Sequence, residues 1–375
     1  MPINNSFRHQ VYAETRPTAK YSLTGPCLIG DGRPDEIEQW RQTWCDADVD
    51  AVYLVHGTFT GNDVLGVVRE IQRFSPHWGA TARELGKSWV DRITGDTGNY
   101  SEPYRQDLAT ILETPREIPV RRFSWSGENY HTARAEAAVQ LLDLLLTRAR
   151  KGERHVVLWG HSHAGNLFAL ITNLIGGNAD AIKRFFHTTR AMNSDNQNAD
   201  VVPWQRVHEH LCNSNQPHGF PRLTIVTFGT PIRYGWETQG YHRLLHFVHH
   251  RPNANLPEWR TEFPFGFDDL LDARHGDYIQ QLGIAGTDFL PSLFSYARWQ
   301  TENRLKGLIE HGLKRLDVLN HLRFGMRVPD EGFTVLVDYP DDTSHLREQL
   351  LGHAVYTKRE WLGFHLREIT QHLFS

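Results

Sequence analysis

The stretch from residue 154 to residue 175, RHVVLWGHSHAGNLFALITNLI, constrains the fold of this chain more than any other part of its sequence. It opens with an apolar run at residues 156–159 that is too short for a helix and is bounded by charge and glycine, which is typical of a buried strand. A turn around Ser162 follows, and then apolar residues recur at helical spacing until Gly176 and Gly177 can end the helix. The pattern predicts a strand, a sharp turn that presents one serine, and a helix.

The turn itself has the sequence GHSHAG at residues 160–165. A serine in a strained turn has its neighbours pressed against the adjoining strand and helix, so these neighbours must be small. This is the context of a serine nucleophile, and the local pattern is G-x-S-x-A, with Ala164 where glycine is usual. The alternative interpretation is that Ser162 only caps the N-terminus of the helix, a role that suits serine.

Other short apolar runs alternate with helical patterns along the chain, whereas residues 1–33 look irregular. Strands alternating with helices favour an α/β fold with a mostly parallel central sheet flanked by helices. Residues 187–222 and 251–303 lack the alternation and predict two insertions, each a candidate lid. No linker is visible, so a single domain over residues 1–375 is expected. The further candidate strands lie at residues 51–55, 119–123, 223–228, 244–248 and 333–337.

Composition limits the partners. The chain has 375 residues, of which 22 % are charged and 39 % hydrophobic, which is ordinary for a globular protein. The formal net charge of −4 argues against nucleic acid as a partner. Three scattered cysteines imply no disulfide framework. The N-terminus lacks the apolar core of a signal peptide and no apolar run reaches the length of a membrane span, so a cytoplasmic location is expected, with signal-less secretion as the alternative.

Several segments, in this order, resemble the α/β-hydrolases of the lipase and esterase type. His56 and Gly57 follow a predicted strand and resemble the oxyanion loop of that family. The GHSHAG turn resembles its nucleophile elbow, and TFGTP at residues 227–231 resembles the T-F-G-x-P segment that closes the next strand in lipases. A histidine between the last strand and the last helix resembles the general base of the family.

A serine hydroxyl is a weak nucleophile unless a base accepts its proton and a carboxylate holds that base in the right tautomer. We therefore expect Ser162 to be the nucleophile and His353 to be the base. Gly352 ends a predicted short helix just before His353, and the last helix follows, so this histidine lies on a loop. His345 is the rival, but it lies inside or at the start of the short helix.

The resemblance places the acid after the candidate strand at residues 244–248. Asp277, in the sequence HGDYI, resembles the acid-bearing turn of lipases and is the preferred candidate. Asp288 lies in a similar glycine turn and is the second candidate. Asp338 follows the last predicted strand, which is off the family pattern, and is the third.

The resemblance also implies an oxyanion hole made by the backbone N–H groups of Thr58 and His163. His56, Gly57 and Phe59 are expected to contact the substrate. The alternative for His56 and Gly57 is an ordinary turn that ends a strand, with His56 forming hydrogen bonds that hold the loop.

The sequence thus predicts a serine hydrolase that cleaves a carboxylic ester, of a small molecule or a lipid, through an acyl-enzyme on Ser162. No cofactor and no metal are expected, because His246, His249 and His250 cluster near a strand end without a paired set of carboxylates. One alternative is a phospholipase that contacts membranes peripherally, and an amidase or thioesterase comes next. Another is a catalytically silent α/β-hydrolase scaffold that binds a ligand or a partner. The oligomeric state stays open.

Overall fold

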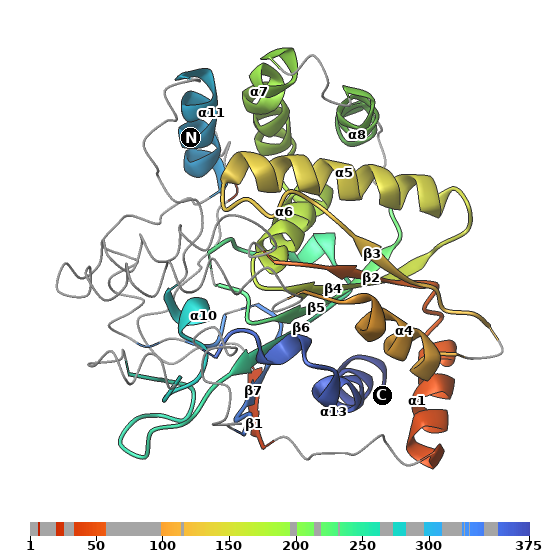
Figure 1. Cartoon of the computed structure of the whole chain (residues 1–375). Helices are drawn as coiled ribbons and strands as arrows, with labels where there is room; N and C mark the ends of the chain where they lie inside the picture. The colour runs from red at the N-terminus through yellow and green to blue at the C-terminus, as the bar shows by residue number, and fades with distance from the viewer. Residues whose placement is uncertain are drawn as a thin grey trace.

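The structure is a computed structural model, and it has an α/β architecture in which helices cover both faces of a parallel sheet (Figure 1). It describes residues 7, 20–25, 34–57, 99–113, 116–195, 201–213, 219–231, 233–262, 273–282, 296–309, 325, 327–329, 331–340 and 352–375.

The sheet has seven strands within the described ranges, in the spatial order β1-β7-β6-β5-β4-β2-β3, and every neighbouring pair is parallel. Strand β4, which carries the GHSHAG turn at its end, lies between β2 and β5. The carboxyl ends of these strands lie at one edge of the sheet, which is where open parallel sheets bind ligands. The strands are β1 (Lys20–Thr24), β2 (Ala51–Val55), β3 (Val120–Phe123), β4 (His155–His161), β5 (Arg222–Phe228), β6 (Arg243–His249) and β7 (Phe333–Val337).

The central strands read as continuous apolar runs because both of their faces are buried. In β4, Val156 and Leu158 pack into one core, whereas Val157 and Trp159 pack into a second core on the other face. This two-sided burial is why the sequence predicted these strands, and the prediction of a mostly parallel sheet with flanking helices is confirmed.

Strand β1 was not predicted, and the expectation of irregular structure over residues 1–33 is wrong at residues 20–24. These residues pair in parallel with β7 at the edge of the sheet. Their side chains are exposed or half-buried, so the segment KYSLT carries no apolar run. An edge strand that is paired on one side only lacks the signal that marks the central strands.

Helices α5 and α6 cover one face of the sheet, and α1, α4 and α13 cover the other (Figure 1). The bounds of the helices are α1 (Pro34–Asp46), α4 (Glu102–Ile111), α5 (His131–Ala149), α6 (Ala164–Gly176), α7 (Ala179–Asp195), α8 (Val201–Asn213), α10 (Tyr278–Leu282), α11 (Tyr296–Ile309) and α13 (Leu362–Ile369), with short 3₁₀ helices at Thr238–Gly240, Val355–Thr357 and Arg359–Trp361 and a π-helix at Thr370–Phe374.

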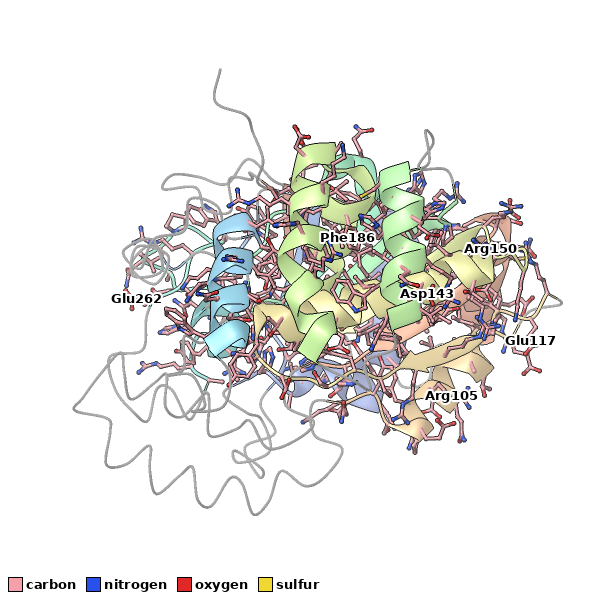
Figure 2. All side chains as sticks on the ribbon, turned by 90° about the horizontal axis from the view of Figure 1, so that it is seen from above. Arg105, Glu117, Asp143, Arg150, Phe186 and Glu262 are labelled. Carbon is pink, nitrogen blue, oxygen red and sulfur yellow. The ribbon has the colours of Figure 1, made fainter. Side chains whose placement is uncertain are left out.

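The first predicted insertion, residues 187–222, contains the end of α7 and all of α8. Figure 2 shows that α7, α8 and α11 form an outer layer over α5. Trp204 and Val207 of α8 are buried in the same core as α5, and Arg206 pairs with Asp143 of α5 at 2.5 Å. Helix α8 is therefore an outer layer on α5 and does not cover the carboxyl edge of the sheet.

The second predicted insertion, residues 251–303, also contributes to the fold. Its end forms the first part of α11, where Glu302 accepts hydrogen bonds from the N–H groups of His131 (2.6 Å) and Thr132 (2.9 Å). Glu302 thus caps the N-terminus of α5, whose own N-cap residue, Tyr130, offers no side-chain hydrogen bond. The lid predicted here falls largely on residues 263–272 and 283–295, which lie outside the described residues.

None of the helices in the described ranges is both long enough and apolar enough to span a bilayer.

Candidate active site

Ser162 follows β4 directly and has a backbone φ of 56°, in the left-handed region that residues other than glycine rarely adopt. Its N–H donates to the carbonyl oxygen of Phe228 on β5 (2.8 Å), and its own carbonyl accepts from Thr230 Oγ1 (2.8 Å). The side chain is buried, and Oγ has no hydrogen-bond partner in the part of the chain that the structure describes. The serine is therefore held in a strained turn with its hydroxyl uncommitted.

Small residues make this turn sterically feasible. A Cβ at Gly165 would lie 2.0 Å from Thr230 Oγ1, and a Cβ at Gly160 would lie 2.4 Å from the ring of Phe168. Ala164, by contrast, is the first residue of α6 and is an ordinary buried residue of the core. The methyl group in the G-x-S-x-A pattern is accommodated, whereas the two glycines are required.

The end of β2 lies against the serine. A Cβ at Gly57 would lie 2.6 Å from Ser162 Cβ and 3.3 Å from Ser162 Oγ. The chain leaving β2 thus passes close to the serine hydroxyl, and the oxyanion loop stays a prediction. Thr58 and Phe59, the other predicted residues of this loop, lie outside the described residues.

His56 uses both ring nitrogens to hold the end of β2. The N–H of Trp125 donates to Nε2 (3.2 Å), so Nδ1 carries the proton and donates to the carbonyl oxygen of Gly57 (2.8 Å). The Trp125 indole N–H in turn donates to the carbonyl oxygen of His56 (2.9 Å). Burial lowers the pKa of His56, in keeping with a neutral imidazole. The geometry favours the loop-holding alternative for His56 over contact with a substrate.

His353 and Asp277 lie together, with Nδ1 of the histidine 2.7 Å from Oδ2 of the aspartate and both side chains fully buried. Asp338, the third candidate for the acid, instead accepts a hydrogen bond from Arg251 Nε (3.0 Å) and is about half exposed. Asp288, the second candidate, lies outside the described residues, as does the rival base His345.

Three groups besides His353 hold Asp277. The Tyr356 hydroxyl donates to Oδ2 (2.8 Å), the N–H of Gln280 donates to Oδ1 (2.9 Å), and Arg327 donates to the backbone carbonyl. Burial alone would raise the pKa of Asp277, but the charge and hydrogen bond of His353, the Gln280 N–H and the Arg327 charge outweigh it, and the pKa is lowered. An ionised carboxylate only accepts hydrogen bonds, so the proton of His353 lies on Nδ1 and the lone pair on Nε2.

Residues at the ends of β4 and β5 pack against His353 and Asp277 and so position them. Gly229, the glycine of the TFGTP segment, has a φ of 59°, and a Cβ there would lie 2.4 Å from the Tyr356 ring and 2.7 Å from Asp277 Oδ2. His161, at the end of β4, places Nε2 3.0 Å from the carbonyl oxygen of His353, and the two rings lie 4.7 Å apart. The residue before Ser162 therefore packs directly on the His353 loop.

Sequence reasoning missed Tyr356, Arg327, Arg134 and Asn166. Arg134 Nη2 (3.3 Å) and Asn166 Nδ2 (3.2 Å) both lie near Nδ1 of His163, the residue after the serine. Asn166 lies in the first turn of α6, a position that a helical wheel could have flagged. Tyr356 follows His353 closely but belongs to no recognised motif, and Arg134 and Arg327 are far from the motifs in sequence.

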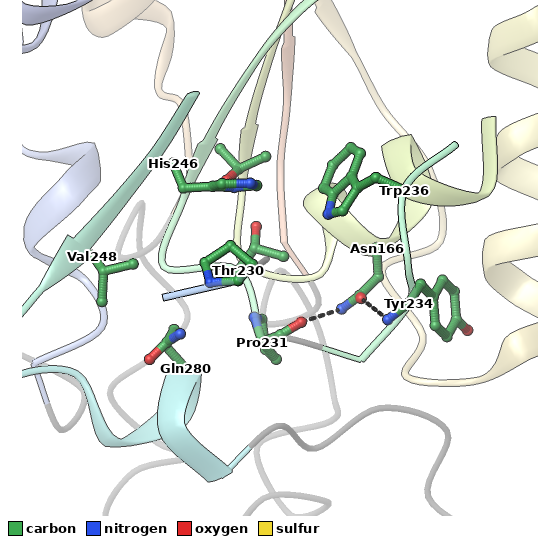
Figure 3. A pocket seen from close by; sticks show the side chains of 10 residues that line it. Asn166, Thr230, Pro231, Tyr234, Trp236, His246, Val248 and Gln280 are labelled. Carbon is green, nitrogen blue, oxygen red and sulfur yellow. Dashed lines mark hydrogen bonds between the residues drawn. The ribbon is translucent and has the colours of Figure 1, made fainter. Parts of the chain in front are cut away.

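A small cavity lies behind Asn166, between α6 and the chain that follows β5 (Figure 3). Its volume is about 10 Å³, room for about one water molecule, so it is too small to be a substrate pocket. Its walls include Pro231, Tyr234 and His246.

Among the described residues no group of three or more His, Cys, Asp or Glu side chains is arranged to hold a metal ion. The three histidines near the end of β6 each lie near a different backbone carbonyl. The pairs are His246 Nε2 with Glu331 (3.1 Å), His249 Nδ1 with Gly352 (3.1 Å) and His250 Nε2 with Glu258 (2.5 Å).

The fold and the geometry define an α/β protein with a buried serine in a strained turn and a buried histidine–aspartate pair at the carboxyl edge of its parallel sheet. Comparisons of the chain with protein-family models, with curated proteins and with solved structures find no match.

Proposed function

We propose that this chain is a serine hydrolase with the α/β-hydrolase fold that cleaves a carboxylic ester, with lipid esters as the expected substrate class. One observation carries the proposal: the buried pair of His353 and Asp277, 2.7 Å apart, packs against the same turn that presents the strained Ser162. The resemblance of the GHSHAG and TFGTP segments to lipases supports the same assignment.

In the proposed reaction, Ser162 Oγ attacks the ester carbonyl carbon while His353 Nε2 accepts the hydroxyl proton. Asp277 keeps the Nδ1 proton in place and stabilises the imidazolium that forms. His353 then gives the proton to the leaving alcohol as the carbon–oxygen bond breaks, which leaves an acyl group on Ser162. Water, activated by the same histidine, hydrolyses the acyl-enzyme and restores the serine.

The negative oxygen of the tetrahedral intermediate needs hydrogen-bond donors that are already in place. The backbone N–H of His163, at the amino end of α6, is one proposed donor, and the helix dipole favours negative charge there. The close approach of Gly57 to Ser162 supports a second donor from the loop after β2, for which Thr58 remains the prediction.

An active-site probe tests the proposal. The purified chain should react with a fluorophosphonate reporter, and peptide mass analysis should find the label on Ser162. Ser162→Ala should abolish labelling, whereas Ser126→Ala, at an exposed serine after β3, should leave it unchanged. A folded wild-type chain that stays unlabelled, while a known serine hydrolase in the same tube is labelled, would favour the silent-scaffold alternative.

A further inference from the structure

The side chain of His163 receives two donors on one ring nitrogen. The residue directly follows Ser162 and is 1 % exposed. Arg134 Nη2, from the first turn of α5, lies 3.3 Å from its Nδ1, and Asn166 Nδ2 lies 3.2 Å from the same atom. If both neighbours can only donate hydrogen bonds, Nδ1 of His163 must accept them and the ring proton must lie on Nε2.

Neither neighbour can accept. A guanidinium has no acceptor, so Arg134 must donate. The Asn166 amide is oriented by the backbone, because its nitrogen donates to the carbonyl oxygen of Pro231 (3.1 Å) and its oxygen accepts from the N–H of Tyr234 (3.2 Å) (Figure 3). Nδ1 of His163 must therefore hold a lone pair, and the proton of the neutral ring lies on Nε2.

The charge of the surroundings also keeps His163 neutral. Arg134 is fully buried, and no carboxylate in the described part of the chain forms an ion pair with it. Its hydrogen bonds go to neutral groups, Asn129 Oδ1 and the Tyr234 hydroxyl (3.3 Å). Burial and then the Arg134 charge lower the pKa of His163 well below its usual value, and the nearby His353 contributes in the same direction.

We propose that Arg134 and Asn166 fix His163 as a neutral imidazole with its proton on Nε2, and that this N–H is a built-in hydrogen-bond donor for an oxygen of the substrate beside the reacting carbonyl. Both side-chain hydrogen bonds of His163 among the described residues are at Nδ1, which leaves Nε2 available to a substrate. The substrates that fit are esters whose acyl chain carries an ether, hydroxyl or carbonyl oxygen close to the ester group. The substrate part rests on the proposed function, whereas the tautomer does not.

A neutral donor suits this position. His353 becomes positively charged while the ester reacts, and a second cation on His163 would oppose that charge. The neutral tautomer donates a hydrogen bond without adding positive charge. It can therefore contact the substrate without disfavouring the protonation of His353. Arg134 is thus a positioning residue that acts through His163.

The tautomer can be measured without any activity. In protein labelled with ¹⁵N-histidine, long-range ¹H–¹⁵N spectra at neutral pH should show a single His163 ring with Nδ1 unprotonated and Nε2 protonated. The His163 signals are assigned by their loss in His163→Gln. Arg134→Met should mix the tautomers, whereas Arg150→Met, at the exposed other end of α5, should not (Figure 2).

A wild-type spectrum with a proton on Nδ1, or with two tautomers in exchange, would overturn the proposal. The wild-type spectrum decides this even if Arg134→Met does not fold.

The donor role is tested with two esters of equal length, 4-nitrophenyl methoxyacetate and 4-nitrophenyl butyrate, which differ by one oxygen in place of a methylene. The ratio of their kcat/KM values, each corrected for the rate with hydroxide, should fall about 2- to 10-fold in His163→Leu, as expected for one neutral hydrogen bond. His163→Gln retains an N–H donor and should keep the ratio near that of the wild type.

An unchanged ratio in His163→Leu would exclude the donor role. If no ester is cleaved and Ser162 is not labelled by the fluorophosphonate, the proposed function fails, while the spectrum still decides the tautomer.

Discussion

The hydroxyl of Tyr356 donates a hydrogen bond to Oδ2 of Asp277, the same oxygen that His353 Nδ1 contacts, at 2.8 Å and 2.7 Å respectively. The Tyr356 oxygen also accepts from the N–H of His249 (2.7 Å) at the end of β6, so the carboxylate is tied to the sheet through the tyrosine. His353 and, through Tyr356, the end of β6 thus converge on one carboxylate oxygen.

Tyr356→Phe should therefore lower kcat/KM by about tenfold, because the carboxylate loses one fixed donor worth about 1.5 kcal/mol. The same loss makes Asp277 harder to ionise, since a donor to the charged form is removed, so the low-pH limb of the activity profile should move to higher pH. A pH–rate profile on a nitrophenyl ester measures both effects. A variant with the wild-type profile would show that His353 and Gln280 alone position the acid.

Asp277→Asn should reduce turnover by roughly 10⁴-fold, because an amide cannot hold His353 in the required tautomer. Asp338→Asn is the matched control, since Asp338 pairs with Arg251 on the surface and should leave turnover near that of the wild type. Steady-state rates, together with circular dichroism to verify folding, compare the two. The reverse order of effects would mean that the acid has been assigned to the wrong strand end.

Ser162→Ala should remove several orders of magnitude of ester hydrolysis and leave the fold intact. Ser162→Gly should be equally inactive but more stable than the alanine variant by about 1 kcal/mol, because glycine adopts a positive φ without strain. Urea unfolding of the two variants gives the difference. Equal stabilities would mean that the turn stores no strain at this residue.

Gly165→Ala should destabilise the protein by about 1–3 kcal/mol, since the added methyl overlaps Thr230. Gly307→Ala, on the outer helix α11, is the control because a methyl group added there would meet no atom of the described residues within 4 Å. Thermal unfolding should therefore distinguish a crowded glycine from an open one. Similar losses at both positions would argue against close contact between α6 and the chain after β5.

Stability should fall as the pH drops below about 6.5, because burial lowers the pKa values of His131, His250 and His365 to about 3. Between pH 6.5, the ordinary pKa of a histidine, and pH about 3, the unfolded chain binds protons at these histidines and the folded chain does not. The free energy of unfolding therefore decreases as the pH falls from 6.5 toward 3. Each such histidine contributes a slope of up to about 1.4 kcal/mol per pH unit.

His365→Gln should remove the contribution of this histidine to the pH slope, and a glutamine side chain can still form a hydrogen bond with the Tyr339 hydroxyl. Denaturant unfolding at several pH values between 7 and 5 measures it. An unaltered slope would mean that His365 takes up a proton in the folded state.

The central strands could be predicted from sequence because burial on both faces makes them continuous apolar runs. Strand β1 was missed because its side chains are exposed or half-buried and form no apolar run. Helix α8 was missed although Trp204, Val207 and Leu211 have helical spacing, because the segment around it is rich in polar residues.

Asp277 and His353 could be nominated from local turns that resemble a known family. Tyr356 and Arg134 could not, since the first meets Asp277 across 79 residues and the second meets His163 across 29, and only tertiary packing creates those contacts.

The cap that Glu302 places on α5 limits how this protein can be re-engineered. Glu302 of α11 binds the N–H groups of the first turn of α5, and Arg134 in the same turn contacts His163, the residue after Ser162. Helix α11 is therefore connected to His163 through a single turn of α5. Trimming the second insertion back past α11 would remove Glu302 and leave that turn of α5 without its cap, and so would exchanging the segment for one from another protein. The segment is thus not an interchangeable module: a graft that alters substrate choice must keep a carboxylate at the Glu302 position.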